Sequence, residues 1–191
     1  MENISVIIPT YCRVKDLIRC LEALKKQTRP ANEIIVVARD TDIETWKALN
    51  SSSLAFLPLT TVKVTFPGQV VALNAGLARV SGDIIAITDD DAMPHQDWLA
   101  RIEQHFLADE LVGGVGGRDL VYHGIQLVQG KRRSIGKLQW FGRITGNHHL
   151  GFGEWRETDI LKGVNMSVRR KAIQGLFFDQ RLKGTGAQVH N

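Results

Sequence analysis

Residues 83–91 read Asp-Ile-Ile-Ala-Ile-Thr-Asp-Asp-Asp, a short apolar run that ends in three consecutive carboxylates. The run 83–88 has the length and the β-branched composition of a strand. It is apolar without alternation, which is typical of a strand covered on both faces of a parallel sheet. This stretch therefore predicts an α/β fold in which the carboxylates lie at the carboxyl end of a buried strand.

On both sides of this strand the chain alternates strand and helix signals. Short β-branched runs predict further strands, and apolar residues at helical spacing predict helices. The predicted strands cover residues 4–8, 33–38 and 62–66, and the predicted helices cover residues 17–27, 42–50, 70–78, 98–107 and 168–177. This alternation predicts a mostly parallel central sheet with helices on both faces, an α/β/α sandwich.

The residues that directly follow each strand form the candidate site, because ligands of such sheets bind at the carboxyl ends of the strands. These residues are Pro9-Thr10-Tyr11, Arg39-Asp40, Pro67-Gly68-Gln69 and Asp89-Asp90-Asp91.

The three aspartates repel one another unless a cation or solvent compensates their charge. Alternate residues of an extended segment point the same way, so Asp89 and Asp91 are predicted to face one ligand. Carboxylate oxygens suit Mn²⁺ or Mg²⁺. A helix-capping acidic loop before Pro94 is the alternative on these residues alone, and the position at a strand end favours the metal site.

The composition is that of an ordinary globular protein of 191 residues, with 43% hydrophobic and 23% charged residues. The net charge of +4 is compatible with a nucleotide ligand or an anionic membrane surface, and equally with a solvated basic surface. Two cysteines, the lack of a signal peptide at 1–5 and the lack of an apolar run of about 20 residues indicate a cytoplasmic protein. Peripheral contact with the inner face of the membrane stays open.

Several other kinds of site are excluded by their missing motifs. The chain has no phosphate-binding loop of the Gly-x-x-x-x-Gly-Lys type, no Cys-x-x-Cys and no His-Glu-x-x-His. Gly114-Val-Gly116 and Gly184-Thr-Gly186 both lack the third glycine of a dinucleotide fingerprint. The adjacent His148 and His149 would diverge on a strand, which favours a solvated or hydrogen-bonded role.

Four segments, taken in order and spacing, are quite specific together, and they span nearly the whole chain. They are 5–13 (Ser-Val-Ile-Ile-Pro-Thr-Tyr-Cys-Arg), 71–91 with its Asn-Ala-Gly and Asp-Asp-Asp, 94–99 with its Asp-Trp-Leu, and 162–170 (Lys-Gly-Val-Asn-Met-Ser-Val-Arg-Arg) followed by Phe178-Asp179. In these segments the chain resembles the family-2 glycosyltransferases with the GT-A fold, a Rossmann-like architecture. The resemblance implies one domain over 1–191, with a nucleotide-binding half at 1–112 and an acceptor-facing half at 113–191.

The resemblance also implies the roles of single residues. Pro9, Thr10 and Tyr11 would line the nucleoside pocket, and Asp40 would lie near the base. Asn74 would lie near the ribose or diphosphate.

Asp89 would contact the ribose or a metal-bound water, Asp91 would bind Mn²⁺ or Mg²⁺, and Asp90 would contact the donor. Gly163, Asn165 and Met166 would form the wall between donor sugar and acceptor.

The sequence departs from the family at three places. Ala38-Arg39 precede Asp40 where the family has Asp directly after the Val-Val pair, and Leu73 stands where the family often has Arg. The acidic pair that supplies the family's general base would fall at or just beyond Asn191. We therefore expect the end of the family domain to be missing, with His190 as the only stand-in.

The implied activity is an inverting, metal-dependent transfer of a hexose-like sugar from a UDP-, GDP- or dTDP-sugar to a carbohydrate or lipid-linked acceptor, in cell-envelope polysaccharide biosynthesis. Two alternatives stay open: a module that binds sugar nucleotides without full catalysis, and a nucleotidyltransferase, which would show a Gly-rich segment after its first strand. Nucleic-acid binding is not expected, because the basic residues are not gathered on one predicted helix.

Overall fold

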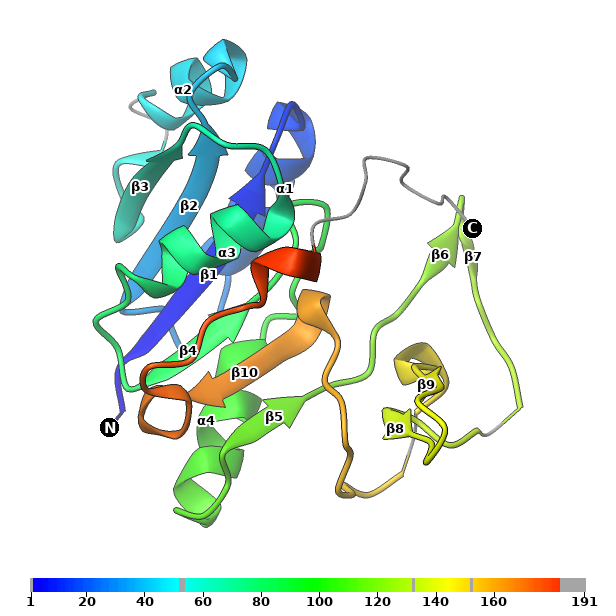
Figure 1. The fold of residues 1–191 in the computed structure, drawn as a ribbon. Helices are drawn as coiled ribbons and strands as arrows, with labels where there is room; N and C mark the ends of the chain where they lie inside the picture. The colour runs from blue at the N-terminus through cyan, green and yellow to red at the C-terminus, as the bar shows by residue number, and fades with distance from the viewer. Residues whose placement is uncertain (1, 52–53, 132, 152, 183–191) are drawn as a thin grey trace.

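A six-stranded mixed sheet runs through the molecule in the order β3-β2-β1-β4-β10-β5 (Figure 1). The computed structural model describes residues 2–51, 54–131, 133–151 and 153–182. The strands of this sheet are β1 (Ile4–Thr10), β2 (Glu33–Arg39), β3 (Leu59–Val64), β4 (Ile84–Ile87), β5 (Gly114–Gly116) and β10 (Met166–Arg169).

The first four strands are parallel, as the alternation of strands and helices predicts. The backbone of β1 and β4 is in register from Ile4 opposite Ile84 to Ile7 opposite Ile87. All seven residues of β1 and all four of β4 are buried, which the unbroken apolar runs predict for strands covered on both faces. The third strand begins and ends earlier than the predicted 62–66.

Helices cover both faces of the sheet and form two separate cores. The helices are α1 (Val14–Lys25), α2 (Ile43–Leu49), α3 (Gln69–Leu77) and α4 (Trp98–Ala108). Side chains of α1, α2 and α4 pack on one face, against residues such as Val6 and Ala86, while α3 packs on the other against Ile7 and Ile85. In Figure 1, α3 lies in front of the sheet. This is the predicted α/β/α sandwich.

The prediction of a helix over 168–177 is wrong. Residues Met166–Arg169 form β10, which pairs antiparallel with β4 and with β5, and only a short 3-10 turn follows at Arg170–Ile173. The strand is held there by Arg169, whose buried guanidinium donates to the carbonyl oxygens of Phe106 and Val112. These contacts come from α4 and the loop after it, so helical spacing within 168–177 did not reveal them.

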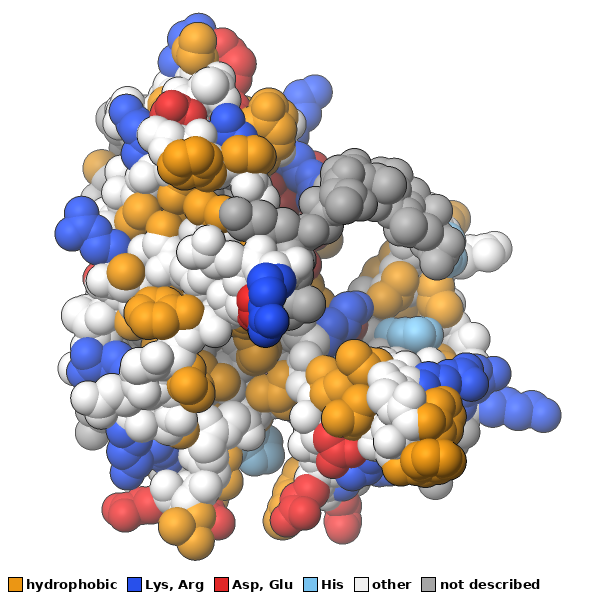
Figure 2. Space-filling view, viewed as in Figure 1, with side chains coloured by type: hydrophobic (Ala, Val, Ile, Leu, Met, Phe, Trp, Pro, Cys, Tyr) orange, Lys and Arg blue, Asp and Glu red, His pale blue; other side chains and the backbone are white. Residues whose placement is uncertain are grey.

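Residues 117–165 leave the sheet after β5 and return to it at β10, and we call this segment the flap. It holds two small antiparallel hairpins, β6 (Tyr122–His123) with β7 (Gln126–Leu127) and β8 (Lys137–Leu138) with β9 (Ile144–Thr145). Figure 1 shows the flap beside the sheet edge, and Figure 2 shows apolar and basic side chains lying side by side on it. Among the described residues, no helix is both long and apolar enough to cross a membrane.

Candidate active site at the carboxyl edge of the sheet

The strand ends of β1 and β4 bring Thr10 and Asp90 into direct contact. The hydroxyl Oγ1 of Thr10 donates a hydrogen bond to Asp90 Oδ2 at 2.7 Å, although 80 residues separate the two in sequence. The parallel pairing of β1 with β4 places their carboxyl ends at one edge, so this contact follows from the sheet register. Asp90 is buried, and its carboxylate therefore serves to fix the two strand ends together.

Arg13 connects the same strand end to two of the three aspartates. Its Nη1 lies 3.1 Å from Asp90 Oδ1 and 2.9 Å from Asp91 Oδ2. Arg13 occupies the position just before α1, after Cys12, whose backbone is left-handed with φ 55°. This turn directs the guanidinium back over the sheet edge, where it partly compensates the acidic run.

Asp89 carries the least compensated charge of the run. Burial raises the pKa of its carboxyl above the ordinary value, and the negative charges of Asp91 and Asp90 raise it further, against smaller opposing effects of Lys162 and Arg13. Its Oδ1 accepts a hydrogen bond from Gln69 Nε2 at 3.3 Å. Burial is the larger cause, and the repulsion from Asp91 and Asp90 is the part that a bound cation would relieve.

The acidic run fits a divalent metal ion only if a bound ligand supplies further oxygen atoms to coordinate the ion. Among the described residues, no group of three or more His, Cys, Asp or Glu side chains is arranged to hold a metal ion. Thr10 and Arg13 engage both oxygens of Asp90, whereas Gln69 contacts only Oδ1 of Asp89 and Arg13 only Oδ2 of Asp91. Mg²⁺ is commonly bound by one or two carboxylates together with substrate phosphates. The carboxylate oxygens therefore fit Mn²⁺ or Mg²⁺ if phosphate oxygens of the ligand complete the coordination.

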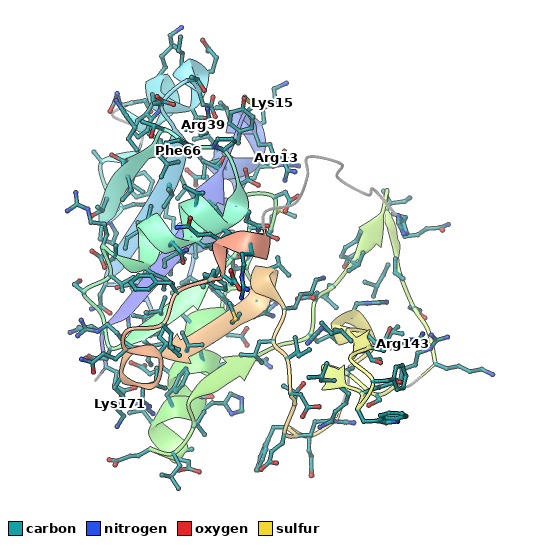
Figure 3. The ribbon with its side chains drawn as sticks, in the orientation of Figure 1. Arg13, Lys15, Arg39, Phe66, Arg143 and Lys171 are labelled. Atoms are coloured by element: carbon teal, nitrogen blue, oxygen red, sulfur yellow. The ribbon has the colours of Figure 1, made fainter. Side chains whose placement is uncertain are left out.

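Cationic side chains gather at the same end of the sheet. Figure 3 labels Arg13, Lys15 and Arg39 near the ends of β1 and β2. The Arg39 guanidinium lies 5.9 Å from the ring centroid of Tyr11, and its Nε lies 3.6 Å from Asp40 Oδ1, an ion pair beyond hydrogen-bond range. This edge thus presents positive charge and an exposed aromatic ring, which together suit an anionic, planar ligand.

Pro9 and Asn74 have structural partners in this structure. Pro9 is a buried residue of β1 opposite Val37. Both polar atoms of the Asn74 amide are engaged by the backbone of Phe178: Nδ2 donates to its carbonyl at 2.9 Å, and Oδ1 accepts from its N–H at 2.8 Å. The contact of Asn74 with ribose or diphosphate stays a prediction.

Gly163 and Asn165 lie in a 3-10 turn, Gly163–Asn165, directly before β10. Asn165 Oδ1 accepts a hydrogen bond from Trp98 Nε1 at 2.9 Å, which fixes the turn beside the start of α4. A Cβ on Gly117 would lie 2.7 Å from Asn165 Nδ2, so a side chain at position 117 would require the Asn165 amide to shift. The turn therefore borders the edge that carries Asp89 to Asp91, on the side of the flap.

The family model for glycosyl transferase family 2 matches residues 5–177, which is most of the chain. The chain belongs to glycosyl transferase family 2. The matched span includes the central sheet, except for Ile4 at the start of β1, and all the candidate site residues described above.

Curated glycosyltransferases are among the similar proteins. The glycosyltransferase AglE of Haloferax volcanii is 35% identical over 101 residues, which cover 51% of this chain and 33% of that protein. The amylovoran biosynthesis glycosyltransferase AmsE of Erwinia amylovora is 30% identical over 147 residues, 73% of this chain and 54% of that protein. The chain thus spans between a third and about half of these relatives' lengths.

Solved structures share the fold. The mannosyltransferase PcManGT of Pyrobaculum calidifontis, in complex with GDP-Man and Mn²⁺, is 32% identical with a TM-score of 0.55, over 61% of this chain and 35% of that one. TarS 1-349 of S. aureus in complex with UDP has a TM-score of 0.69 and 18% identity, over 96% of this chain and 52% of that one. The predicted GT-A fold is confirmed.

Three residues of this family-2 site had no role assigned from the sequence. The strand-end rule singled out Gln69 without giving it a role, and Arg13 lies two residues beyond the Pro9-Thr10-Tyr11 segment that the rule selected after β1. Trp98 was assigned to an apolar helix position and to the Asp-Trp-Leu segment of the resemblance, but the need of its partly buried indole N–H for an acceptor was not considered. His148 is buried with Nε2 3.1 Å from the carbonyl oxygen of Ile160, in line with the expected hydrogen-bonded role.

Proposed function

We propose that the protein binds the diphosphate of a nucleotide sugar at the carboxyl edge of β1 and β4 and transfers the sugar, with inversion, to an acceptor hydroxyl. The observation that carries the proposal is the convergence of Asp89, Asp90 and Asp91 with Thr10 and Arg13 at this edge, within a chain of glycosyl transferase family 2.

Different side chains at this edge bind different parts of the donor. Tyr11 is exposed beside Arg39 and offers a ring face to the base, and Asp40 offers an acceptor nearby. Arg13 moves from compensating Asp91 toward the phosphate oxygens as the negative charge of the leaving diphosphate develops. The turn with Gly163 and Asn165 closes the side that faces the acceptor.

Asp89 and Asp91 would hold a Mn²⁺ or Mg²⁺ ion, which neutralises the charge of the departing diphosphate as a Lewis acid. Asp90 fixes the geometry of the run, because Thr10 and Arg13 bind its two oxygens. A carboxylate base on the opposite face of the sugar removes the acceptor proton. None of the described residues is assigned as that base, and the stand-in His190 lies outside the described residues.

Titration calorimetry with GDP, UDP and dTDP, each with and without Mn²⁺, tests the donor part of the proposal. We expect binding that strengthens when Mn²⁺ is present, and a preference for one nucleotide. The mannosyltransferase PcManGT was solved with GDP-Man, which makes GDP the first nucleotide to test. Failure of all three nucleotides to bind with Mn²⁺ would exclude the proposed site.

Asp91→Ala tests the metal part of the proposal. Loss of one ionic transition-state contact lowers turnover about 10²-fold or more. Asp109→Ala is the matched control, because Asp109 is an exposed carboxylate after α4. Transfer near the wild-type rate in Asp91→Ala, with the fold intact, contradicts the role of Asp91.

A sugar-nucleotide-binding module without full catalysis is the second candidate, because none of the described residues is assigned as the base. Strong nucleotide binding without transfer by the 191-residue chain would favour it. We also propose that the protein acts in the cytoplasm, at the inner face of the membrane, and that its acceptor is a carbohydrate or a lipid-linked molecule. The relative AmsE is a biosynthesis enzyme for amylovoran, which supports a polysaccharide acceptor.

A further inference from the structure

The β8–β9 hairpin of the flap presents a defined apolar tip. Gln139 N donates to Arg143 O at 2.8 Å, and Gly142 N donates to Gln139 O at 2.8 Å, which closes the turn between the two strands. Gly142 has φ +86°, and no atom lies within 4 Å of its notional Cβ. The tip is thus an ordered turn that projects away from its surroundings.

Four large apolar side chains cover this tip. Trp140 is 96% exposed, and its ring lies 5.5 Å from the ring of Phe141 in an edge-to-face arrangement. Leu138 lies opposite Ile144 in the hairpin, and both are more than half exposed. Apolar groups clustered on a protruding turn are costly in water and mark an interaction surface.

The charged residues within the hairpin segment are all basic, and Asp159 is a carboxylate that packs against this segment, on Lys137 and on the backbone N–H of Leu138. Residues 131–145 contain five Lys and Arg and no Asp or Glu. Residues 118–162 contain eight Lys and Arg against four Asp and Glu, a net +4 that equals the net charge of the whole chain. The rest of the chain is therefore neutral on balance, and the basic character lies in the flap.

Part of this charge is free to meet a partner. Lys137 is paired with Asp159 at 3.2 Å, whereas Arg143 has no ion pair with any residue that the structure describes. Figure 3 shows Arg143 on the flap, at the right, and Lys171 at the lower left, away from the flap. Figure 2 shows basic side chains beside apolar ones on the flap.

We propose that the β8–β9 hairpin docks on an anionic lipid bilayer, with Trp140 and Phe141 in the headgroup region and Arg143 against lipid phosphates. Tryptophan is favoured at membrane–water interfaces because its ring is apolar while its N–H remains hydrated. Basic residues beside such an apolar group add attraction to anionic lipid. A small apolar tip in a segment whose own charges are all basic, and in which Lys137 alone forms an ion pair among the described residues, with Asp159, suits an anionic bilayer better than a protein surface of mixed charge. This inference does not depend on the transfer reaction.

Co-sedimentation with vesicles tests the docking without measuring activity, so its failure is distinct from failure of the proposed function. We expect the wild-type protein to bind phosphatidylcholine vesicles that contain phosphatidylglycerol, and to bind pure phosphatidylcholine much more weakly. Salt should weaken the binding to the anionic vesicles, because the attraction is screened. Tryptophan emission should shift to the blue on binding, and Trp140→Phe should lose that shift.

Matched variants locate the contact on the hairpin. Arg143→Ala should weaken vesicle binding about five-fold, whereas Lys171→Ala, which removes the same charge elsewhere, should leave it unchanged. The double variant Trp140→Ala and Phe141→Ala should weaken binding about ten-fold or more. Leu111→Ala removes a 92%-exposed apolar side chain outside the flap and should have no effect.

The proposal is overturned if anionic vesicles bind no better than neutral ones, or if the aromatic double variant binds like the wild type. It is also overturned if the wild type self-associates in gel filtration, the double variant does not, and neither binds vesicles. In that case a second copy of the chain covers the tip. Thermal unfolding monitored by circular dichroism checks that each variant is folded.

Discussion

Asn74 and Phe178 hold each other through two hydrogen bonds, one from the Asn74 amide to the Phe178 carbonyl at 2.9 Å and one from the Phe178 N–H to Asn74 Oδ1 at 2.8 Å. The Asn74 amide thus donates to and accepts from the backbone of one residue, as a paired strand does, and that residue lies 104 positions away. It ties the segment after β10 to α3, on the face of the sheet that α3 covers.

Asn74→Ala should lower the free energy of unfolding by about 1–3 kcal/mol, because it leaves a partly buried N–H and carbonyl of Phe178 unpaired. Urea denaturation measures this loss. Asn50→Ala, at an exposed asparagine just after α2, should change the unfolding free energy by less than about 0.5 kcal/mol. Equal effects of the two variants would contradict the role given to Asn74.

Asp42→Ala should lower the free energy of unfolding by about 2–3 kcal/mol. The buried Asp42 carboxylate caps α2 through Thr45 N at 3.3 Å and also accepts from Cys12 N at 2.6 Å. Nucleotide affinity should fall as well, because the Cys12 contact holds the turn that carries Tyr11. Glu44→Ala, on the exposed first turn of α2, is the control, and calorimetry with unfolding curves gives both readouts.

Gly82→Ala should lower the free energy of unfolding by about 1–3 kcal/mol. The new Cβ would lie 2.7 Å from the carbonyl oxygen of Asn3 and 2.9 Å from the backbone N of Ser5, and backbone atoms cannot move aside as a flexible side chain can. Gly113→Ala is the matched control, since its nearest atom, Ala172 Cβ, would be 3.6 Å away. Similar denaturation midpoints for the two variants would disprove the close packing of Gly82 against the backbone at the start of β1.

Arg13→Ala should tighten the binding of Mn²⁺ alone, measured by calorimetry without nucleotide. The guanidinium now competes with a metal for Asp91, at 2.9 Å, in a partly exposed setting. Removal of one such pair is worth up to about 1 kcal/mol, or roughly a five-fold change in affinity. Arg19→Ala removes an arginine paired with Asp16 instead and should leave Mn²⁺ affinity unchanged. Weaker Mn²⁺ binding in Arg13→Ala would count against the competition.

Cys20 should resist thiol reagents at pH 8 in the folded protein, while the exposed Cys12 reacts. Burial raises the pKa of the Cys20 thiol to about 12, and the nearby charges of Asp90, Asp91 and Asp89 act in the same direction. Because a raised pKa favours the protonated thiol, only about 10⁻⁴ of Cys20 is the reactive thiolate at that pH. Ellman's reagent should titrate one thiol in the native protein and two in guanidinium. Two fast thiols in the native state would refute the burial of Cys20.

Much of the fold could be predicted because its central strands are unbroken apolar runs. Ile84–Ile87 and residues 34–37 have no polar face to present to solvent, so only a sheet covered on both sides accommodates them. The start of α2 at Asp42 also follows from local sequence, because a short polar side chain before a helix satisfies a free backbone N–H.

The antiparallel strand β10 could not be predicted from local pattern. It has four residues, its partners lie about 80 and 50 positions away, and it ends in Arg169, a charged residue that sequence reasoning places on the surface. Its burial depends on carbonyl acceptors at Phe106 and Val112. The same limit applies to the site: strand ends predicted the aspartates, but the Arg13 contacts span 77 and 78 residues and are set by the tertiary fold.

The flap begins and ends at paired backbone, because Gly116 lies opposite Met166 between β5 and β10. The flap is therefore an insertion whose two ends are held at fixed positions by the sheet. Lengthening it costs little, roughly 0.6 kcal/mol of closure entropy for each doubling, and leaves the hydrogen bonds of the sheet untouched. Changes in the length or sequence of the flap can therefore alter the proposed membrane contact without moving the strand ends that carry Thr10 and Asp90.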